Sequence, residues 1–250
     1  MLRVNLLEQS NGNKMLRSRK QVLSLVCLAL VLPGTFSSAS FAKDHKISKT
    51  ELKKSTASTP KALCSTTTAS AHKEPQIQPP AVKLPVRNRT FTFDTNCGQI
   101  VIEADGARAP LTVLVMSALA KGGYFNQTLC HRLTTAGLFV LQCGDPTATG
   151  SGGPMFTYDD ENLPDPVQND YPAGTVAMAN SGLSQTGHGT NGSQFFLVYA
   201  DTTLGANYTR WGKITKGLDI LRAIAAQGVV GGASDGTPKQ TVGIEKVTVK

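Results

Sequence analysis

The sequence has few of the residues that usually form metal sites or covalent catalytic centres, with four histidines and five cysteines among 250 residues. Cys130 and Cys143 have no second cysteine or histidine near them at the spacing of zinc ligands, which argues against a zinc site. Cys130 is followed directly by His131. Adjacent strand residues point to opposite faces, so these two cannot form a thiolate–imidazole pair. We therefore expect no metal, no cofactor and no covalent intermediate.

A phosphate-binding loop is also missing. The glycine-rich stretch from Gly150 to Gly153 is not followed by the Lys-Ser/Thr pair that such a loop requires, so it is interpreted as turn material.

Basic charge is lacking from the greater part of the chain, although the net charge is +8. Residues 1–90 contain 15 Lys and Arg against 4 Asp and Glu, whereas residues 91–250 contain 10 against 13. Nucleic-acid binding needs basic residues gathered on one face of a folded domain. Because the expected folded part is slightly acidic, we expect no nucleic acid among the partners.

The N-terminal region lacks an apolar run of the ~20 residues that a membrane-spanning helix requires. A basic stretch over residues 15–20 precedes an apolar run over residues 22–32, and Ser40 and Ala42 place small residues where a signal peptidase cleaves. The pattern predicts a signal peptide over residues 1–42, with an uncleaved membrane anchor as the alternative. We therefore expect an exported protein that is secreted, periplasmic or associated with the cell envelope.

Large apolar side chains are scarce between residues 43 and 89, where Lys, Ser, Thr and Pro dominate. Such a segment buries too little apolar area to offset a backbone ordering cost of about 1–2 kcal/mol per residue. It is predicted to be a disordered basic spacer. Its charge allows weak electrostatic contact with a membrane or cell wall, and a solvated tether without a specific partner is the alternative.

Regular structure is expected over residues 90–250. Phe91 and Phe93 alternate with polar residues, as do Ile100 and Ile102, which predicts a hairpin turning near Asn96-Cys97-Gly98. Helices are predicted over residues 111–121 and 218–226, and further strands over residues 129–133, 139–143, 174–180, 194–199 and 242–249. Many short strands without a βαβ rhythm favour a mainly β fold, a closed eight-stranded antiparallel barrel capped by two helices.

Several motifs of residues 90–250 resemble the cyclophilin-type peptidyl-prolyl cis-trans isomerases, in a bacterial exported form. The motifs, in chain order, are His131-Arg132, Phe139-Val140-Leu141-Gln142-Cys143-Gly144-Asp145, Asp160-Glu161-Asn162, Met178-Ala179-Asn180 and Thr190-Asn191-Gly192-Ser193-Gln194-Phe195-Phe196. The resemblance implies a monomer that accelerates rotation about X–Pro bonds in exported proteins and so assists their folding. Proline-containing polypeptides are the implied partners.

The resemblance also implies roles for ten residues. Catalysis would fall to Arg132, Gln142 and Tyr208, whereas His131 takes no part. Substrate binding would fall to Phe139, Val140, Ala179, Asn180, Gln194, Phe196 and Leu204. Taken singly, each also has an ordinary structural interpretation, as core residue, turn former or surface charge.

Three questions stay open at this level. The same pocket would serve a non-catalytic module that binds proline segments, or a chaperone of the cell envelope. A structural cell-wall protein would explain the basic spacer but not the motifs. Cys130 and Cys143 fall on consecutive strands, where a disulfide and two free thiols are both compatible with the sequence.

Overall fold

The computed structural model describes residues 4–6 and 63–250. The predicted signal peptide, apart from the short strand β1 (Val4–Leu6), lies outside the described residues, as does the predicted spacer up to residue 62. β1 pairs antiparallel with β7 (Phe156–Tyr158). Within the described part of the chain, no helix combines the length and the apolar character needed to cross a membrane.

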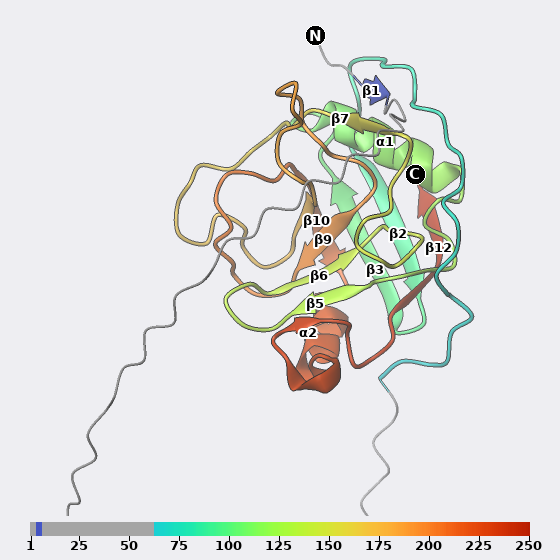
Figure 1. Cartoon of the computed structure of the whole chain (residues 1–250), viewed down its shortest axis with the longest axis vertical. Helices are drawn as coiled ribbons and strands as arrows, with labels where there is room; N and C mark the ends of the chain where they lie inside the picture. Colours follow the sequence, from blue (N-terminus) through green and yellow to red (C-terminus); the bar gives the residue numbers. More distant parts are fainter. Residues whose placement is uncertain (1–3, 7–62) are drawn as a thin grey trace, which may run out of the picture. The chain divides into compact units, whose positions relative to one another are not determined.

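An antiparallel sheet of ten strands forms the centre of the fold (Figure 1). Its order across the sheet is β11 (Asp235–Gly236), β5 (Arg132–Thr134), β6 (Val140–Cys143), β9 (Phe195–Val198), β8 (Thr175–Met178), β10 (Arg210–Lys216), β3 (Gly98–Ala104), β2 (Arg89–Thr95), β12 (Gly243–Val249) and β4 (Thr128–Leu129). β4 and β5 lie near opposite ends of this order, yet only Cys130 and His131 separate them in the chain. The sheet therefore curls round toward itself.

The mainly β, antiparallel architecture is confirmed, but the strand count differs from the predicted eight. The expected strand over residues 129–133 is divided into β4 and β5, and the two-residue strand β11 adds to the far edge. β4 and β11 are too short to leave an apolar pattern in the sequence, and β10 was not located by the predicted ranges either.

Two α-helices lie toward opposite ends of the sheet, as predicted (Figure 1). They are α1 (Pro110–Lys121) and α2 (Leu218–Gln227), and a short 3-10 helix, η1 (Val230–Gly232), follows α2. Pro110 starts α1 at a position where an N–H would have no helical partner. The next two N–H groups, of Leu111 and Thr112, donate to the Glu161 carboxylate at 3.3 and 2.6 Å. Glu161 thus caps the helix from a distant loop.

Strand alternation divides the apolar side chains between an inner core and a smaller outer cluster. Leu141 on β6 and Phe195 on β9 belong to the inner core, where the buried Trp211 packs edge-on against Phe195 at a centroid distance of 6.0 Å. Their strand neighbours Val140 and Phe196 belong to the outer cluster. The outer cluster consists of buried Val140, Tyr171, Ala177, Phe196 and Val198, with Ala179, Leu204 and Tyr208 packed against them.

The predicted disordered spacer is wrong for residues 63–89. Residues 63–88, which we call the N-terminal segment, follow the side of the domain (Figure 1), and a disulfide joins Cys64 to Cys97. The backbone N–H of Ser70 donates to the Gln127 carbonyl at 3.1 Å, and that of His72 donates to the Pro146 carbonyl at 2.9 Å. A covalent bond and backbone hydrogen bonds replace the apolar burial that the composition lacks. The folded domain therefore begins well before residue 90.

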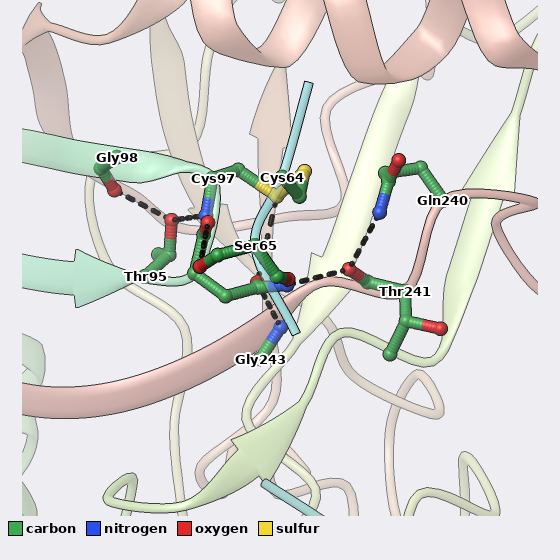
Figure 2. Close-up of a disulfide and its surroundings, with 9 residues drawn as sticks. Cys64, Ser65, Thr95, Cys97, Gly98, Gln240, Thr241 and Gly243 are labelled. Carbon is green, nitrogen blue, oxygen red and sulfur yellow. Dashed lines mark hydrogen bonds between the residues drawn. A yellow bond between two sulfur atoms is a disulfide. The ribbon is translucent and has the colours of Figure 1, made fainter. Parts of the chain in front are cut away.

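Figure 2 shows the surroundings of this disulfide. Hydrogen bonds of Asn96, the residue before Cys97, complete the attachment. Its side-chain amide donates to the carbonyls of Ser65 and Thr241 at 2.8 and 3.1 Å, and its side-chain oxygen accepts the Gly243 N–H at 2.8 Å. The Ser65 N–H and hydroxyl both donate to the Asn96 carbonyl. One buried residue at the β2–β3 turn thus ties the N-terminal segment to the start of β12.

Candidate active site

Arg132 and Gln142 stand opposite each other on paired strands. The β5–β6 register places Arg132 against Gln142, the β6–β9 register places Gln142 against Phe196, and the β8–β9 register places Phe196 against Ala177. Residues directly opposite each other in a ladder share a face of the sheet. A row of side chains therefore crosses four strands and leads from a guanidinium to the outer apolar cluster.

The guanidinium of Arg132 is held from two sides. Its Nε and Nη2 donate to the two carboxylate oxygens of Asp235 at 2.8 and 2.7 Å, and its Nη1 donates to the Gln142 side-chain oxygen at 3.1 Å. A guanidinium has five N–H donors in a fixed fork. Three are used here, so two remain for a ligand, and the side chain of Arg132 is 39% exposed.

Asp235 could not be predicted from the sequence. The only signal is the stretch Ser234-Asp235-Gly236, which is typical of a turn and gives no hint of a distant arginine. The β5–β11 pairing brings Asp235 across from Thr134, two residues beyond Arg132. Asp235 thereby supplies the counter-charge that orients the guanidinium.

The outer cluster presents an apolar surface beside the ion pair of Arg132 and Asp235. Tyr208 packs edge-on against Phe196, with ring centroids 5.5 Å apart, and Tyr171 holds Tyr208 through two hydrogen bonds between its hydroxyl and the Tyr208 backbone. Leu204 is fixed by its N–H, which donates to the Asp170 carboxylate at 2.9 Å. Four of the predicted residues, Val140, Phe196, Leu204 and Tyr208, are thus brought together, and Ala179 packs against them.

Phe139 is not part of this surface. It is half-buried and packs edge-on against Tyr199, with centroids 5.9 Å apart, and both belong with the inner core. Phe139 directly precedes Val140, and adjacent residues along a strand face opposite ways. Phe139 thus packs with the inner core rather than with the outer cluster, and its role in the pocket stays a prediction.

Gln194 extends the polar side of the site. It accepts the Gln142 amide at 2.8 Å, and its own amide donates to the carbonyls of Gly150 and Gly152, each at 2.9 Å. A hollow of about 520 Å³ lies here, and Gln142, Ala179, Asn180 and Gln194 are among the residues that line it. A second hollow of about 430 Å³ contains Arg132 and Asp235 and shares Gln142 with the first. The two hollows also share Gly150, and we call the two together the groove.

The loop beside the groove is fixed rather than loose. The buried Asp145 carboxylate accepts the N–H groups of Thr147, Thr149, Gly150 and Gly152 at 2.7 to 3.1 Å. Burial opposes this charge, but the hydrogen bonds hold the pKa of Asp145 below its ordinary value. The stretch interpreted as turn material therefore forms a rigid wall.

Asn180 lies at the groove, but its side chain is used within the protein. Its amide donates to the Asp160 carboxylate at 3.2 Å and to the Asn207 carbonyl at 2.9 Å, and its oxygen accepts the Gly182 N–H. Asn180 thus fixes the loop that begins at Ser181, and only its exposed edge is available to a ligand.

Charge at the site is stable around neutral pH. The hydrogen bond from Arg132 holds the pKa of Asp235 below its usual value, and the same bond raises the pKa of Arg132. Desolvation lowers the pKa of His131, so that imidazole is neutral. The site therefore provides a fixed cation beside an apolar surface.

Cys130 and Cys143 are joined in a disulfide, which resolves the question left open by the sequence.

Comparisons with known proteins agree with this geometry. The model of the family described as cyclophilin type peptidyl-prolyl cis-trans isomerase/CLD matches residues 90–249. The chain is 42% identical over 187 residues to a probable peptidyl-prolyl cis-trans isomerase B of Mycobacterium leprae (strain TN), covering 68% of this chain and 61% of that protein. The protein of the same name from Mycobacterium tuberculosis (strain CDC 1551 / Oshkosh) is 43% identical over 164 residues, covering 61% and 52%. The aligned part thus spans less than two thirds of these relatives.

A solved structure of a cyclophilin type peptidyl-prolyl cis-trans isomerase from Cryptosporidium parvum is similar, with a TM-score of 0.55 and 26% identity, over 66% of this chain and 98% of that one. The structure determined in the presence of the dipeptide Ala-Pro gives a TM-score of 0.53 and 26% identity, over 64% and 98%. Because the family model matches well over half of its length, the chain belongs to the cyclophilin-type peptidyl-prolyl cis-trans isomerase family.

Proposed function

We propose that the chain catalyses cis–trans rotation about X–Pro peptide bonds in proline-containing polypeptides. The observation that carries the proposal is the guanidinium of Arg132, which Asp235 and Gln142 fix in the row of side chains that ends in the outer apolar cluster. Two of its donors stay free for a peptide.

The barrier to this rotation is about 18–20 kcal/mol because amide resonance gives the C–N bond double-bond character. Uncatalysed exchange therefore takes tens of seconds or longer. As the bond twists, resonance is lost and the prolyl nitrogen becomes pyramidal with a localised lone pair. A donor that bonds this lone pair stabilises the twisted state more than the planar one, and so lowers the barrier.

Each part of the groove has a task in this scheme. Val140, Phe196, Leu204 and Tyr208 accept the apolar pyrrolidine ring, and Gln142 and Gln194 bind the peptide backbone on one side. Arg132 donates toward the prolyl nitrogen while the unheld side of the peptide turns. Arginine suits this task because it keeps its charge and holds its donors in a fixed fork. Neither a nucleophile nor a base is required of the protein.

The alternative is a module that binds proline segments, or a chaperone of the cell envelope, without turnover. The decisive measurement is the rate at which an X–Pro peptide relaxes from cis to trans after the full chain is added. Proton NMR exchange measures this rate. Catalysis predicts relaxation far faster than the uncatalysed tens of seconds. Saturable peptide binding with unchanged relaxation would support the binding module instead.

Replacing Asp235 by asparagine tests whether this carboxylate positions Arg132. We expect Asp235→Asn to lower kcat by about three- to tenfold with little change in KM, because the guanidinium loses its charged partner but stays in the groove. Asp165→Asn, which removes a carboxylate from an exposed loop, is the matched control. If Asp235 served only stability, the melting temperature would fall while kcat stayed at the wild-type value.

Export fits the cysteine chemistry. Two disulfides, Cys64–Cys97 and Cys130–Cys143, favour an oxidising compartment. We propose that residues 1–42 act as a signal peptide or anchor. We also propose that the enzyme is monomeric, is secreted, periplasmic or envelope-associated, and assists the folding of other exported proteins.

We further propose that the curled sheet is a closed barrel, since β4 and β5 are consecutive in the chain. This is supported by the Cys130 N–H, which donates to the Val242 carbonyl at 2.9 Å, and by the His131 N–H, which donates to the Gln142 carbonyl at 3.1 Å.

A further inference from the structure

We propose that Glu74 determines substrate specificity, so that the site favours prolines that have a lysine or arginine nearby in the substrate. The inference rests on the proposed function, because the hollow that Glu74 lines shares Gln142 and Gly150 with the hollow that contains Arg132. Glu74 belongs to the N-terminal segment and lies outside residues 90–249, which the family model matches.

Glu74 lines the 520 Å³ hollow on the polar side of the site. The hollow begins at Gln142, whose side chain bonds Arg132 at 3.1 Å, and it extends past Gln194 to the loop around Gly152. An extended peptide advances about 3.3 Å per residue. Because Gln142 and Gly150 line both this hollow and the one that contains Arg132, we expect a substrate residue a few positions from the proline to reach the hollow.

The chemistry of the hollow is set by one charge. Among the described residues that line it, Glu74 is the only ionisable side chain, and the others are glycines, hydroxyls, amides and small or apolar groups. Within residues 63–250 the Glu74 carboxylate has neither an ion-pair nor a hydrogen-bond partner. The nearby Asp145 carboxylate is already satisfied by the N–H groups of its own loop. A cation brought by the substrate would thus meet an uncompensated carboxylate.

Attachments on both sides hold Glu74 in place. Before it, the His72 N–H donates to the Pro146 carbonyl at 2.9 Å, and the Cys64–Cys97 disulfide anchors the start of the segment (Figure 2). After it, Ile77 packs against the inner core, close to Gly122 at the end of α1. The backbone that carries Glu74 is therefore already ordered before a substrate binds, so only the side chain has to be ordered at that moment.

The test uses the full chain and three sets of X–Pro peptides, in which lysine, glutamine or glutamate is placed in turn at each of three positions on either side of the proline. For the wild type we expect one position at which kcat/KM is about three- to tenfold higher with lysine than with glutamate, as for a partly exposed ion pair. Glu74→Gln should bring that ratio close to one, and Glu74→Lys should invert it. Raising the salt concentration should shrink the wild-type ratio.

Glu245→Gln is the matched control, because it removes the same charge from an exposed position on β12 outside the hollow. It should keep the wild-type lysine-to-glutamate ratio. A wild type without any preference, or a Glu74→Gln variant that keeps it, would overturn the inference.

Peptide affinity, measured by calorimetry on the same variants, separates this inference from the proposed function. Binding that favours lysine and loses this preference in Glu74→Gln, without any catalysis, would uphold the role of Glu74 and refute the isomerase. Fast isomerisation of all peptides at equal rates would support the isomerase and refute the role of Glu74. Absence of both binding and catalysis would overturn both.

Discussion

Replacing Arg132 by alanine is expected to lower kcat/KM for an X–Pro peptide by about ten- to a thousandfold, which corresponds to about 1.4–4 kcal/mol of lost transition-state stabilisation. The variant removes the only described cation in the row that leads to Phe196. Arg132→Lys should recover only a small part of the activity, because an ammonium keeps the charge but loses the fork that Asp235 and Gln142 hold.

Stability should hardly change in Arg132→Ala, since both partners of the ion pair are more than one third exposed and such pairs contribute about 0–1 kcal/mol. Thermal unfolding beside the peptide assay checks this. Arg108→Ala is the matched control, because it removes an arginine whose exposed ion pair with Asp105 lies away from the groove. Activity of Arg132→Ala near the wild-type value would refute the proposed mechanism.

Replacing Phe196 by alanine should affect both activity and stability. Phe196 is 5% exposed and packs against the rings of Tyr171 and Tyr208, so its removal should cost about 3–5 kcal/mol of unfolding free energy. The apolar surface loses its central ring at the same time. We expect KM to rise, and kcat/KM to fall at least tenfold, in peptide kinetics on the folded variant.

Phe195→Ala separates these two effects, because Phe195 is the neighbour of Phe196 on β9 and points into the inner core. It should lower the denaturation midpoint by a comparable amount, while kcat/KM per folded molecule stays near the wild-type value. Equal losses of kcat/KM in both variants would show that Phe196 acts through stability alone.

Local sequence patterns were sufficient to predict the helices and strands whose ends or faces are marked by particular residues. Pro110 and Gly122 bound α1, and alternating apolar residues defined the β2–β3 hairpin, so both were predicted. β10 was missed because its sequence, Arg-Trp-Gly-Lys-Ile-Thr-Lys, buries only Trp211 and Ile214. Its seven residues are held by pairing with β3 and β8, which no local pattern reveals.

The candidate site also combines residues that local motifs predict with residues that only tertiary pairing brings to the groove. Residues within recognisable motifs, such as Arg132, Gln142 and Phe196, could be predicted and are adjacent in the structure. Asp235 and Glu74 could not be predicted, because tertiary pairing alone brings a turn residue and a segment without apolar pattern to the groove. The motif position of Phe139 was clear, but its packing against Tyr199 depends on the tertiary structure and could not be read from the motif.

The pairing of β2 with β12 has a consequence for how the protein is made. Thr90 and Lys250 exchange two backbone hydrogen bonds, each of 3.0 Å, so the earliest strand of the ten-stranded sheet pairs with the last. Contacts between such distant segments form slowly. They also cannot form before β12 has left the ribosome. We expect the nascent domain to stay unfolded until β12 has emerged, so that its first strand waits for its last before the sheet can form.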